Sequence, residues 1–226
     1  MLFCSGKIDE NTSWNYKPLM PTFRYTCVVS YENDYWVIGC NESGSRVYHY
    51  KYNQQNHIWS YKYLPYPNIS NIFFINEQKG WAFGENKLLF SSNGGTNWSV
   101  QKAKDGVLFT SIDFVSINEG WLSQYNGKLF HTLNSGNTWE EIYSNPDYLI
   151  NSIDFIDENT GWAVGRKKGV DYTDFNGFII STLDGGKTWN ESPFSVTALY
   201  KVKFINKETG YAMGDKYIIA TNTGGQ

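Results

Sequence analysis

Short runs of alternating apolar and polar residues fill most of the chain, and one such run recurs along it. Each copy places apolar side chains two residues apart, then a polar turn, then a second apolar strand, as in SIDFIDENTGWAVG. A two-residue period is typical of a β-strand with one buried face. The turn formers Asn, Asp and Gly between the two strands predict an antiparallel hairpin. Five copies occur, and they end at Gly39, Gly84, Gln124, Gly165 and Gly214.

One aromatic residue anchors the second strand of every copy. The anchors lie 45, 40, 41 and 49 residues apart, and they are Trp36, Trp81, Trp121, Trp162 and Tyr211. A third strand follows each of the last four hairpins, for example KLFHT in the third copy. A period of roughly 40–50 residues with several strands per period is the length of one blade of a β-propeller.

A second signature follows the third strand. It reads SSNGGTNW at 91–98, TLNSGNTW at 132–139 and TLDGGKTW at 182–189. This is the Asp-box pattern: glycine permits the positive φ of a tight turn, and the Asp or Asn side chain accepts hydrogen bonds from backbone N–H groups of the turn. We expect the tryptophan to bury its ring between blades. We interpret these box residues as structural rather than catalytic: Asn93, Gly95, Trp98, Asn134, Gly136, Trp139, Asp184, Gly186 and Trp189.

The two signatures together predict an all-β fold, a β-propeller of four-stranded antiparallel blades with about five blades visible. We expect an N-terminal segment at 1–13 and a single propeller domain at 14–226, with blade units near 23–64, 70–103, 109–143, 150–194 and 199–226. The box in the last unit, TNTGGQ, stops before its Thr-Trp. Two alternatives remain open: a closed five-bladed ring in which 14–19 supplies the outer strand of the last blade, or a fragment of a larger ring.

The composition agrees with strands and excludes some partners. Aromatic residues make up 18% of the chain and there are 21 glycines, a mixture that favours strands joined by tight turns. The formal net charge is −3 with only three arginines, Arg24, Arg46 and Arg166. The basic stripe that nucleic acid requires is therefore absent, and we expect no nucleic-acid partner. No apolar run reaches the ~18 residues of a transmembrane segment.

The three cysteines are too few for a disulfide framework. Cys27 and Cys40 flank a predicted hairpin turn, so we expect them either to face each other across the hairpin and form a disulfide or to be two separately buried thiols. Cys4 lies in MLFCSG, which resembles the end of a bacterial lipoprotein signal. Lipid anchoring at Cys4 is one interpretation, and a chance match is the other.

The chain from about residue 70 onward resembles the photosystem II assembly and stability factor family. The resemblance lies in the combination of GWAVG with T-x-DGG-x-TW. It implies an Asp-box propeller related to the BNR repeats of sialidases, non-catalytic, exported and binding protein partners. With three arginines the chain has no large Arg-rich patch, so we transfer the architecture and not the photosystem partner. We expect a bacterial protein with an extracytoplasmic location: secreted, periplasmic or surface-attached.

One loop stands out as a candidate binding segment. RKKGVDYTDFN, at 166–176, is the longest connection between a second and a third strand, and insertions on one propeller face are often where binding evolves. The alternative is a solvated variable loop. The candidate ligand-binding residues on this face are Arg46, Tyr125, Arg166, Lys167, Lys168, Tyr172 and Asp215. We expect no cofactor and no metal, because the spacing of the three histidines, His49, His57 and His131, does not match a metal site.

Two functions remain in competition. The first is a non-catalytic binding or scaffold propeller that holds a protein or a glycan on its loop face. The second is a fragment of an Asp-box glycoside hydrolase, similar to a sialidase or a xyloglucanase. A sialidase needs an arginine triad, a Tyr nucleophile with its Glu partner and an Asp acid, and a xyloglucanase needs paired carboxylates across a cleft. Loop carboxylates such as Asp147 could serve the second function, but solvated loop residues are the commoner explanation.

Overall fold

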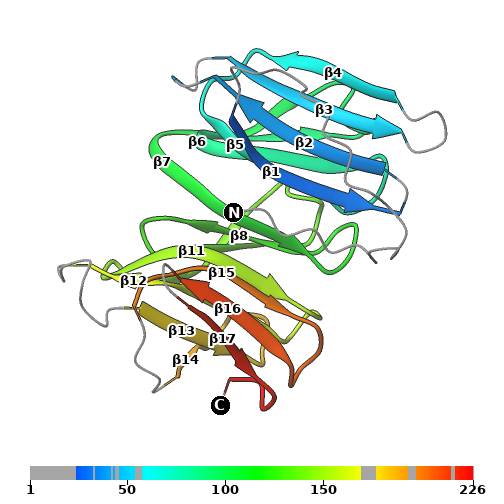
Figure 1. Ribbon diagram of the computed structural model, residues 1–226. Coiled ribbons are helices and arrows are strands. Elements are labelled where there is room, and N and C mark those ends of the chain that lie inside the picture. The colour runs from blue at the N-terminus through cyan, green and yellow to red at the C-terminus, as the bar shows by residue number, and fades with distance from the viewer. Residues whose placement is uncertain are drawn as a thin grey trace. The chain divides into compact units, whose positions relative to one another are not determined.

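The computed structural model describes residues 24–225 except 33, 42, 44–45, 54–57, 169–176, 193–196 and 215–216. Every regular element in the described part is a strand, and the all-β prediction is confirmed (Figure 1). The strands of the N-terminal half are β1 Arg24–Tyr31, β2 Asp34–Cys40, β3 Val47–Asn53, β4 Ile58–Leu64, β5 Ile69–Phe74, β6 Gly80–Ser91 and β7 Ser99–Phe114. Those of the C-terminal half are β8 Gly120–Gln124, β9 Lys128–Thr132, β10 Glu140–Ser144, β11 Tyr148–Phe155, β12 Gly161–Lys167, β13 Gly177–Thr182, β14 Asn190–Glu191, β15 Leu199–Phe204, β16 Gly210–Gly214 and β17 Ile218–Thr221.

The chain divides into two compact units. The first comprises Met1–Gly84 with Leu89–Val100, and the second comprises Glu85–Leu88 with Gln101–Gln226. The first unit contains the sheet β1-β2-β3-β4 and the hairpin β5-β6. The second contains β7-β8-β9-β10, then β11-β12-β13-β14, then β15-β16-β17, each in chain order and antiparallel. The boundaries predicted for the propeller domain and its blades stay predictions, and a closed ring is not shown.

The hairpin predicted from the first signature forms in every copy, and in the last four copies a glycine begins the second strand for a steric reason. In β11 and β12, Phe155 pairs with Gly161. A Cβ atom on Gly161 would lie 2.4 Å from the Phe155 ring, so only glycine fits under the phenylalanine. Between the strands, Asp157 Oδ1 accepts the N–H groups of Asn159 (2.9 Å) and Thr160 (2.6 Å). The turn-forming aspartate therefore stabilises the turn by accepting hydrogen bonds from its backbone.

The Asp-box turn is also held by its own side chains. The hydroxyl of Thr182 accepts the N–H of Gly186 at 2.9 Å. Asp184 Oδ1 accepts the N–H of Thr188 at 2.9 Å, and its Oδ2 accepts the Thr188 hydroxyl at 2.6 Å. Gly185 and Gly186 have φ of 77° and 94°, a conformation that favours glycine. The polar side-chain atoms of the box therefore form hydrogen bonds within the turn itself.

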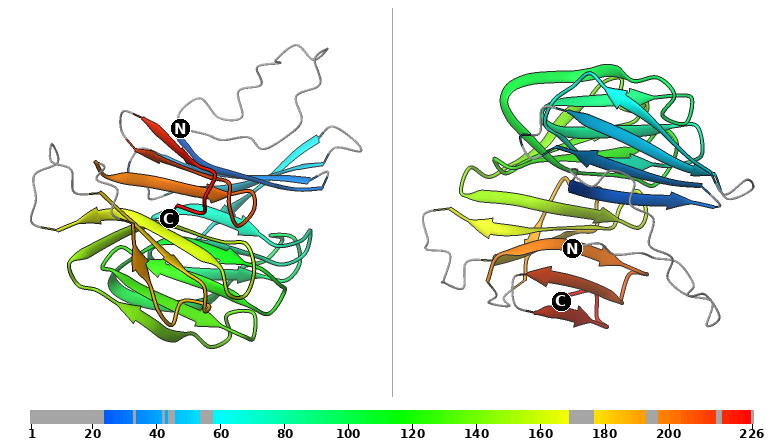
Figure 2. Two further views of the ribbon diagram at one scale, coloured as in Figure 1. Left: turned by 90° about the horizontal axis from the view of Figure 1, so that it is seen from below. Right: turned by 45° about the horizontal axis from the view of Figure 1, so that its top comes forward.

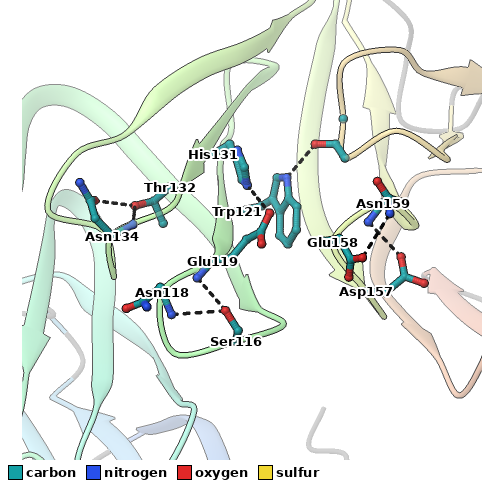
Figure 3. Close-up of polar contacts among 12 residues, drawn as sticks. Ser116, Asn118, Glu119, Trp121, His131, Thr132, Asn134, Asp157, Glu158 and Asn159 are labelled. Carbon is teal, nitrogen blue, oxygen red and sulfur yellow. Dashed lines mark hydrogen bonds and ion pairs between the residues drawn. The ribbon is translucent and has the colours of Figure 1, made fainter.

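An indole and a phenyl ring join each sheet to the next within a unit. Trp121 of β8 stacks on Phe155 of β11 with ring centroids 3.8 Å apart and planes 4° apart. Its Nε1–H donates a hydrogen bond of 3.0 Å to the carbonyl of Gly185 in the next Asp-box turn (Figure 3). Trp162 repeats this arrangement with Phe204 (3.4 Å, 5°) and the Gly224 carbonyl (2.9 Å).

The first unit repeats the same arrangement. Trp36 stacks on Phe74 at 4.1 Å and donates to the Gly94 carbonyl at 3.2 Å. We call this arrangement, a first-signature Trp with the Phe and the box glycine of the following repeat, the indole clamp. The clamp tryptophans are almost wholly buried, with 0–2% of their surface exposed.

The Asp-box tryptophans also pack between sheets, but they are less deeply buried than the clamp tryptophans. They are only half-buried, and they lie edge-on against the phenylalanine of their own repeat, as Trp189 does on Phe155 (6.1 Å, 89°). They also contact rings of the preceding sheet, as Trp98 does with His49 of β3 (5.9 Å) and Trp189 with Tyr143 of β10 (5.9 Å). Both classes of tryptophan therefore pack between successive sheets, and the first-signature tryptophans are the more deeply buried.

The two described cysteines do not face each other, and both are thiols. The strand register pairs Cys27 with Ile38 and Cys40 with Arg24, with an irregularity in the register beside Cys27. The Cys27 thiol donates to the carbonyl of Ile72 at 3.5 Å. Burial raises the pKa of the Cys40 thiol. The facing pair that the sequence allowed was therefore wrong, since the two residues lie at different heights in the hairpin.

The clamp makes a prediction that separates the two classes of tryptophan. Trp162→Ala is expected to lower the free energy of unfolding by about 3–5 kcal/mol, because it empties a fully buried ring site. Trp189→Ala is expected to cost about 1–2 kcal/mol, since part of that ring is already exposed. Urea titration followed by circular dichroism measures both. Equal losses for the two variants would contradict the assignment of the clamp to Trp162.

Candidate binding site on the loop face of the second unit

The structure places four of the seven predicted site residues in the second unit. Tyr125 follows β8, and Arg166, Lys167 and Lys168 lie at the end of β12. Arg46 belongs to the first unit, directly before β3, where its N–H donates to the side chain of Asn41 at 2.9 Å. Tyr172 and Asp215 lie outside the described residues.

Two of the predicted residues contact each other across successive sheets. Arg166 Nη2 donates a hydrogen bond of 3.1 Å to the phenol oxygen of Tyr125. Both side chains are half-buried. Because Tyr125 follows β8 and Arg166 ends β12, the contact joins equivalent ends of two neighbouring repeats, which is what the repeat alignment predicted for this face.

Lys167 belongs to a second contact group on the same sheet. Its ammonium lies 2.6 Å from Glu191 Oε1, and Tyr148 donates its phenol proton to Glu191 Oε2 at 2.6 Å. The Tyr148 ring stacks on Phe178 with centroids 4.2 Å apart, and the Lys167 ammonium lies 5.8 Å from the Tyr148 ring centroid. The stacked ring fixes the phenol, and the phenol and the ammonium together fix the carboxylate.

The ionisation of this group follows from its contacts. Partial burial raises the pKa of Glu191, but the hydrogen bonds from Lys167 and Tyr148 outweigh it, so the pKa lies below its ordinary value. Burial, and then the neighbouring Glu191, raise the pKa of Tyr148. At neutral pH the group therefore consists of a carboxylate, an ammonium and a neutral phenol. A general acid would need a carboxyl group with a raised pKa, and Glu191 is the opposite.

The backbone at this end of the sheet is also held in place. The N–H of Lys168 donates to the carbonyl of Asp147 at 2.7 Å, which extends the β11–β12 ladder by one residue. Lys168 is exposed and Lys167 is 41% exposed at its side chain. The described part of the site therefore offers a run of three basic residues beside two tyrosines, with Asp147 and Glu191 as the nearby acids.

Glu191 is the site residue that sequence reasoning missed. It follows the Asp-box tryptophan in the two-residue strand β14, which pairs with β13. Its only signal in the sequence is a position two residues after Trp189. Short edge strands carry little periodicity, so this residue could not be singled out as a partner of Tyr148.

The carboxyl groups with raised pKa lie elsewhere, on the first strands of the repeats. Asp113 Oδ2 accepts the N–H of Phe155 at 2.7 Å, and Asp154 Oδ2 accepts the N–H of Phe204 at 2.6 Å. Asp154 Oδ1 also lies 2.6 Å from the ammonium of Lys203. Each carboxyl group thus binds the backbone of the following repeat, which is a structural use.

Burial sets the protonation of this carboxyl pair. Burial, reinforced by the nearby Asp154, raises the pKa of Asp113 to about 7. Burial also raises the pKa of Asp154, although Lys203 opposes it. Because the two carboxyl groups interact, they titrate as a pair. No group of three or more His, Cys, Asp or Glu side chains among the described residues is arranged to hold a metal ion.

The described part of the chain contains no helix that is long and apolar enough to cross a membrane.

Antiparallel sheets that repeat every 40–50 residues and carry Asp-box turns define a BNR-repeat protein of the β-propeller type. The family model described as photosynthesis system II assembly factor YCF48 matches residues 51–148. The chain is a BNR-repeat propeller protein that resembles this assembly factor. Among curated proteins, no sequence matches that of this chain.

Solved structures share the fold at low sequence identity. YCF48 from Cyanidioschyzon merolae is 19% identical with a TM-score of 0.60, and the match covers 92% of this chain and 72% of that one. U3-55K is 7% identical with a TM-score of 0.69, covering 88% and 61%. An ancestral GH74 enzyme is 16% identical with a TM-score of 0.58, covering 94% and 34%. YCF48 bound to a D1 peptide is 19% identical with a TM-score of 0.49, and the match spans about half of that chain, 53%.

The carboxyl pair generates a pH prediction. The pKa of Asp113 is about 7 in the folded protein and 3.8 for the ordinary group, so the folded state holds more protons between these values. The protonated Asp113 carboxyl therefore stabilises the folded state fully below about pH 4, and this stabilisation is lost as the pH rises to about 7. Asp113→Asn should remove this slope and raise the free energy of unfolding at pH 7 by about 1–3 kcal/mol. Urea titrations from pH 4 to pH 8 measure it.

Asp157→Asn is the matched control for this measurement. Its carboxylate takes hydrogen bonds from Lys207 and from two backbone N–H groups, which outweigh burial and lower its pKa to about 2. Its contribution is present above pH 4 and is lost as the pH falls toward 2, so the control should lower stability at pH 7 and leave the slope between pH 4 and pH 7 in place. A slope that persists in Asp113→Asn would show that other groups produce it.

Proposed function

We propose that the protein is a non-catalytic binding propeller that holds a protein partner on the loop face of its second unit. The recognition elements are the basic run at 166–168 and the phenols of Tyr125 and Tyr148. The observation that carries the proposal is the fixed geometry of this face: Arg166 is bonded to Tyr125, and Lys167 and Tyr148 are bonded to Glu191. A surface that is ordered before binding loses less side-chain entropy when a partner docks.

The chemistry of the face favours an acidic segment of a protein. Three consecutive cationic residues against two acids leave a positive excess, and tyrosine and arginine are residue types enriched in protein interfaces. The resemblance to a photosystem II assembly factor also supports a protein partner. The partner itself is proposed only by its chemistry, an exposed acidic stretch that also offers apolar side chains to the tyrosine rings.

The glycoside hydrolase alternative has a weaker basis. The GH74 likeness is at 16% identity and concerns the fold, and the described carboxyl groups with raised pKa are bonded to backbone N–H groups of the next repeat. We expect no hydrolysis of a fluorogenic xyloglucan oligosaccharide or a fluorogenic sialoside by the purified chain. Turnover that follows the protein through purification would favour the enzyme.

We propose that the protein acts outside the cytoplasm. This proposal is supported by the resemblance to an exported family. Fractionation of the native host, with the chain detected by an antibody, tests the location. Recovery in the cytoplasmic fraction alone would reject it.

The binding proposal predicts a charge effect that is local to the loop face. A labelled octaglutamate peptide should bind the full chain at low salt, and the double variant Lys167→Ala/Lys168→Ala should weaken binding by about five- to tenfold. Fluorescence anisotropy measures the affinity. The control is Lys187→Ala/Lys201→Ala, which removes the same charge from two exposed lysines elsewhere in the second unit. An equal loss in both double variants, or no binding of the peptide by the unaltered chain, would reject the loop face as the site.

A further inference from the structure

One buried position of the first sheet holds a histidine where later repeats hold an aliphatic residue. His49 of β3 pairs with Ile38, which lies two residues after the clamp tryptophan of that sheet. The same register position holds Leu129 in β9 and Ile179 in β13. His49 is only 5% exposed. A titratable ring therefore occupies a place that two later repeats fill with an apolar side chain.

The His49 ring packs on the Asp-box turn of the second repeat. A Cβ atom on Gly95 would lie 2.7 Å from the ring, so the glycine backbone touches it directly. The ring also lies edge-on to Trp98, with centroids 5.9 Å apart and planes at 77°. Strands β1–β4, blue to cyan in Figure 2, form the sheet that carries His49. The sheet and the turn belong to the same unit, so the histidine is part of a contact within the first unit.

The ring nitrogens of His49 lack hydrogen-bond partners. Neither Nδ1 nor Nε2 contacts a donor or an acceptor in the described part of the chain. A neutral imidazole leaves one donor and one acceptor unpaired there, which is already unfavourable. An imidazolium would leave two donors and a buried charge without a partner. The folded contact therefore accepts His49 in its neutral form and opposes its protonated form.

The charged groups around His49 act in the same direction. Lys51 on β3 and Lys62 on β4 both disfavour a positive charge on the ring. Lys62 donates to the carbonyl of Thr96, which holds its ammonium at the box turn. Asp34, the acid of β2, is already paired with Lys51 at 2.8 Å. The box turn itself has no charged residue, and the turn between β5 and β6 carries one charge of each sign, Glu77 and Lys79. The other titratable groups packed against this cluster are neutral in acid: Cys27, Tyr31, Cys40 and Tyr66.

The direction of the pH effect follows from these surroundings. Burial, and then Lys51 and Lys62, lower the pKa of His49 from 6.5 to about 4. Between these values the unfolded chain binds a proton that the folded unit does not bind, so stability rises with pH. The stabilisation is complete above about pH 6.5 and is lost as the pH falls toward 4. The Asp113–Asp154 pair of the second unit responds in the opposite sense, because burial raises both pKa values.

We propose that His49 is an acid-sensitive switch that releases the first sheet, β1–β4, from the Asp-box turn of the second repeat while the sheets of the second unit stay packed. The ring gains a proton, and the protonated ring reaches water when the sheet and the turn separate. Separation uncovers the apolar face that contains Trp36 and Phe74. The switch lies within the first unit, and it does not depend on the function proposed for the loop face.

The thiol of Cys27 reports this separation. It lies on β1, is partly buried against the same cluster, and donates to the carbonyl of Ile72 in β5. In a chain with Cys4→Ser and Cys40→Ser, Cys27 is the single thiol. Its rate of labelling by 4,4′-dithiodipyridine, which reacts with thiols in acid, is measured relative to glutathione. This ratio should rise about 20-fold between pH 7 and pH 5, as the change in the pKa of His49 requires.

Hydrogen exchange of the second unit tests whether the opening is local. Protection of the amides in β11, β12 and β13, corrected for the intrinsic pH dependence of exchange, should not fall between pH 7 and pH 5. A fall equal to the rise in Cys27 labelling would mean that the whole chain unfolds, and it would overturn the proposal.

Substitutions at His49 test the assignment to this ring. His49→Leu copies Leu129 and should abolish the pH dependence of Cys27 labelling, and His49→Gln should do the same with a polar side chain. The matched control is His131→Gln, since His131 lies in the second unit and is bonded to Glu119 at 3.1 Å. The control should keep the 20-fold rise. No rise in the chain with His49, or an equal rise in either folded variant at position 49, would overturn the proposal. If neither variant folds, Cys27 labelling compared with exchange in β11–β13 still decides it.

Discussion

The indole clamp is the interaction on which the described sheets depend. Its tryptophan combines a stacked contact with a phenylalanine of the next repeat and a hydrogen bond to a glycine carbonyl of the next Asp-box turn, as Trp162 does with Phe204 and Gly224. A buried indole N–H without an acceptor would be costly. The carbonyl reaches the indole only because the positive φ of the box glycines turns it that way. The two sequence signatures are therefore halves of one contact, contributed by neighbouring repeats.

The sequence contained enough to predict the sheets but not how deeply each class of tryptophan is buried between them. Strand period, turn formers and box glycines act locally, so the hairpins and the box turns formed as predicted. How deeply a tryptophan is buried between sheets depends on the position of its strand in the sheet, and the residue pattern around Trp162 and Trp189 does not give this difference. The facing cysteine pair was one of two alternatives, and the strand register excludes it. Arg24 pairs with Cys40, so Cys27 lies three residues further along β1, opposite Ile38, and the residue pattern of a single hairpin does not give this register.

Repeat alignment anticipates one contact within the candidate site and misses another. Tyr125 and Arg166 hold equivalent positions in consecutive repeats, so the alignment placed them on one face and the structure brings them into contact. Glu191 lies in a two-residue edge strand with no period to read, yet it organises Lys167 and Tyr148. Contacts that cross from one strand end to another depend on register and rotamer, and neither is encoded in composition or spacing.

A second set of polar contacts runs in the same direction as the clamp. The residue directly before the phenylalanine is Asp113, Asp154 and then Lys203 in three successive repeats, and each aspartate binds the N–H of the following phenylalanine. Burial, reinforced by the repulsion between these two carboxyl groups, raises the pKa of Asp113 and keeps a proton on the pair, and the ammonium of Lys203 beside Asp154 is favourable there. Lysine cannot accept an N–H, so this series ends at the last repeat. The repeats that carry Asp113 and Asp154 therefore recognise the next repeat through an N–H and a carbonyl of its backbone, and side-chain substitutions in the recognised repeat alter these contacts through the phenylalanine and the turn that hold the two backbone groups in place.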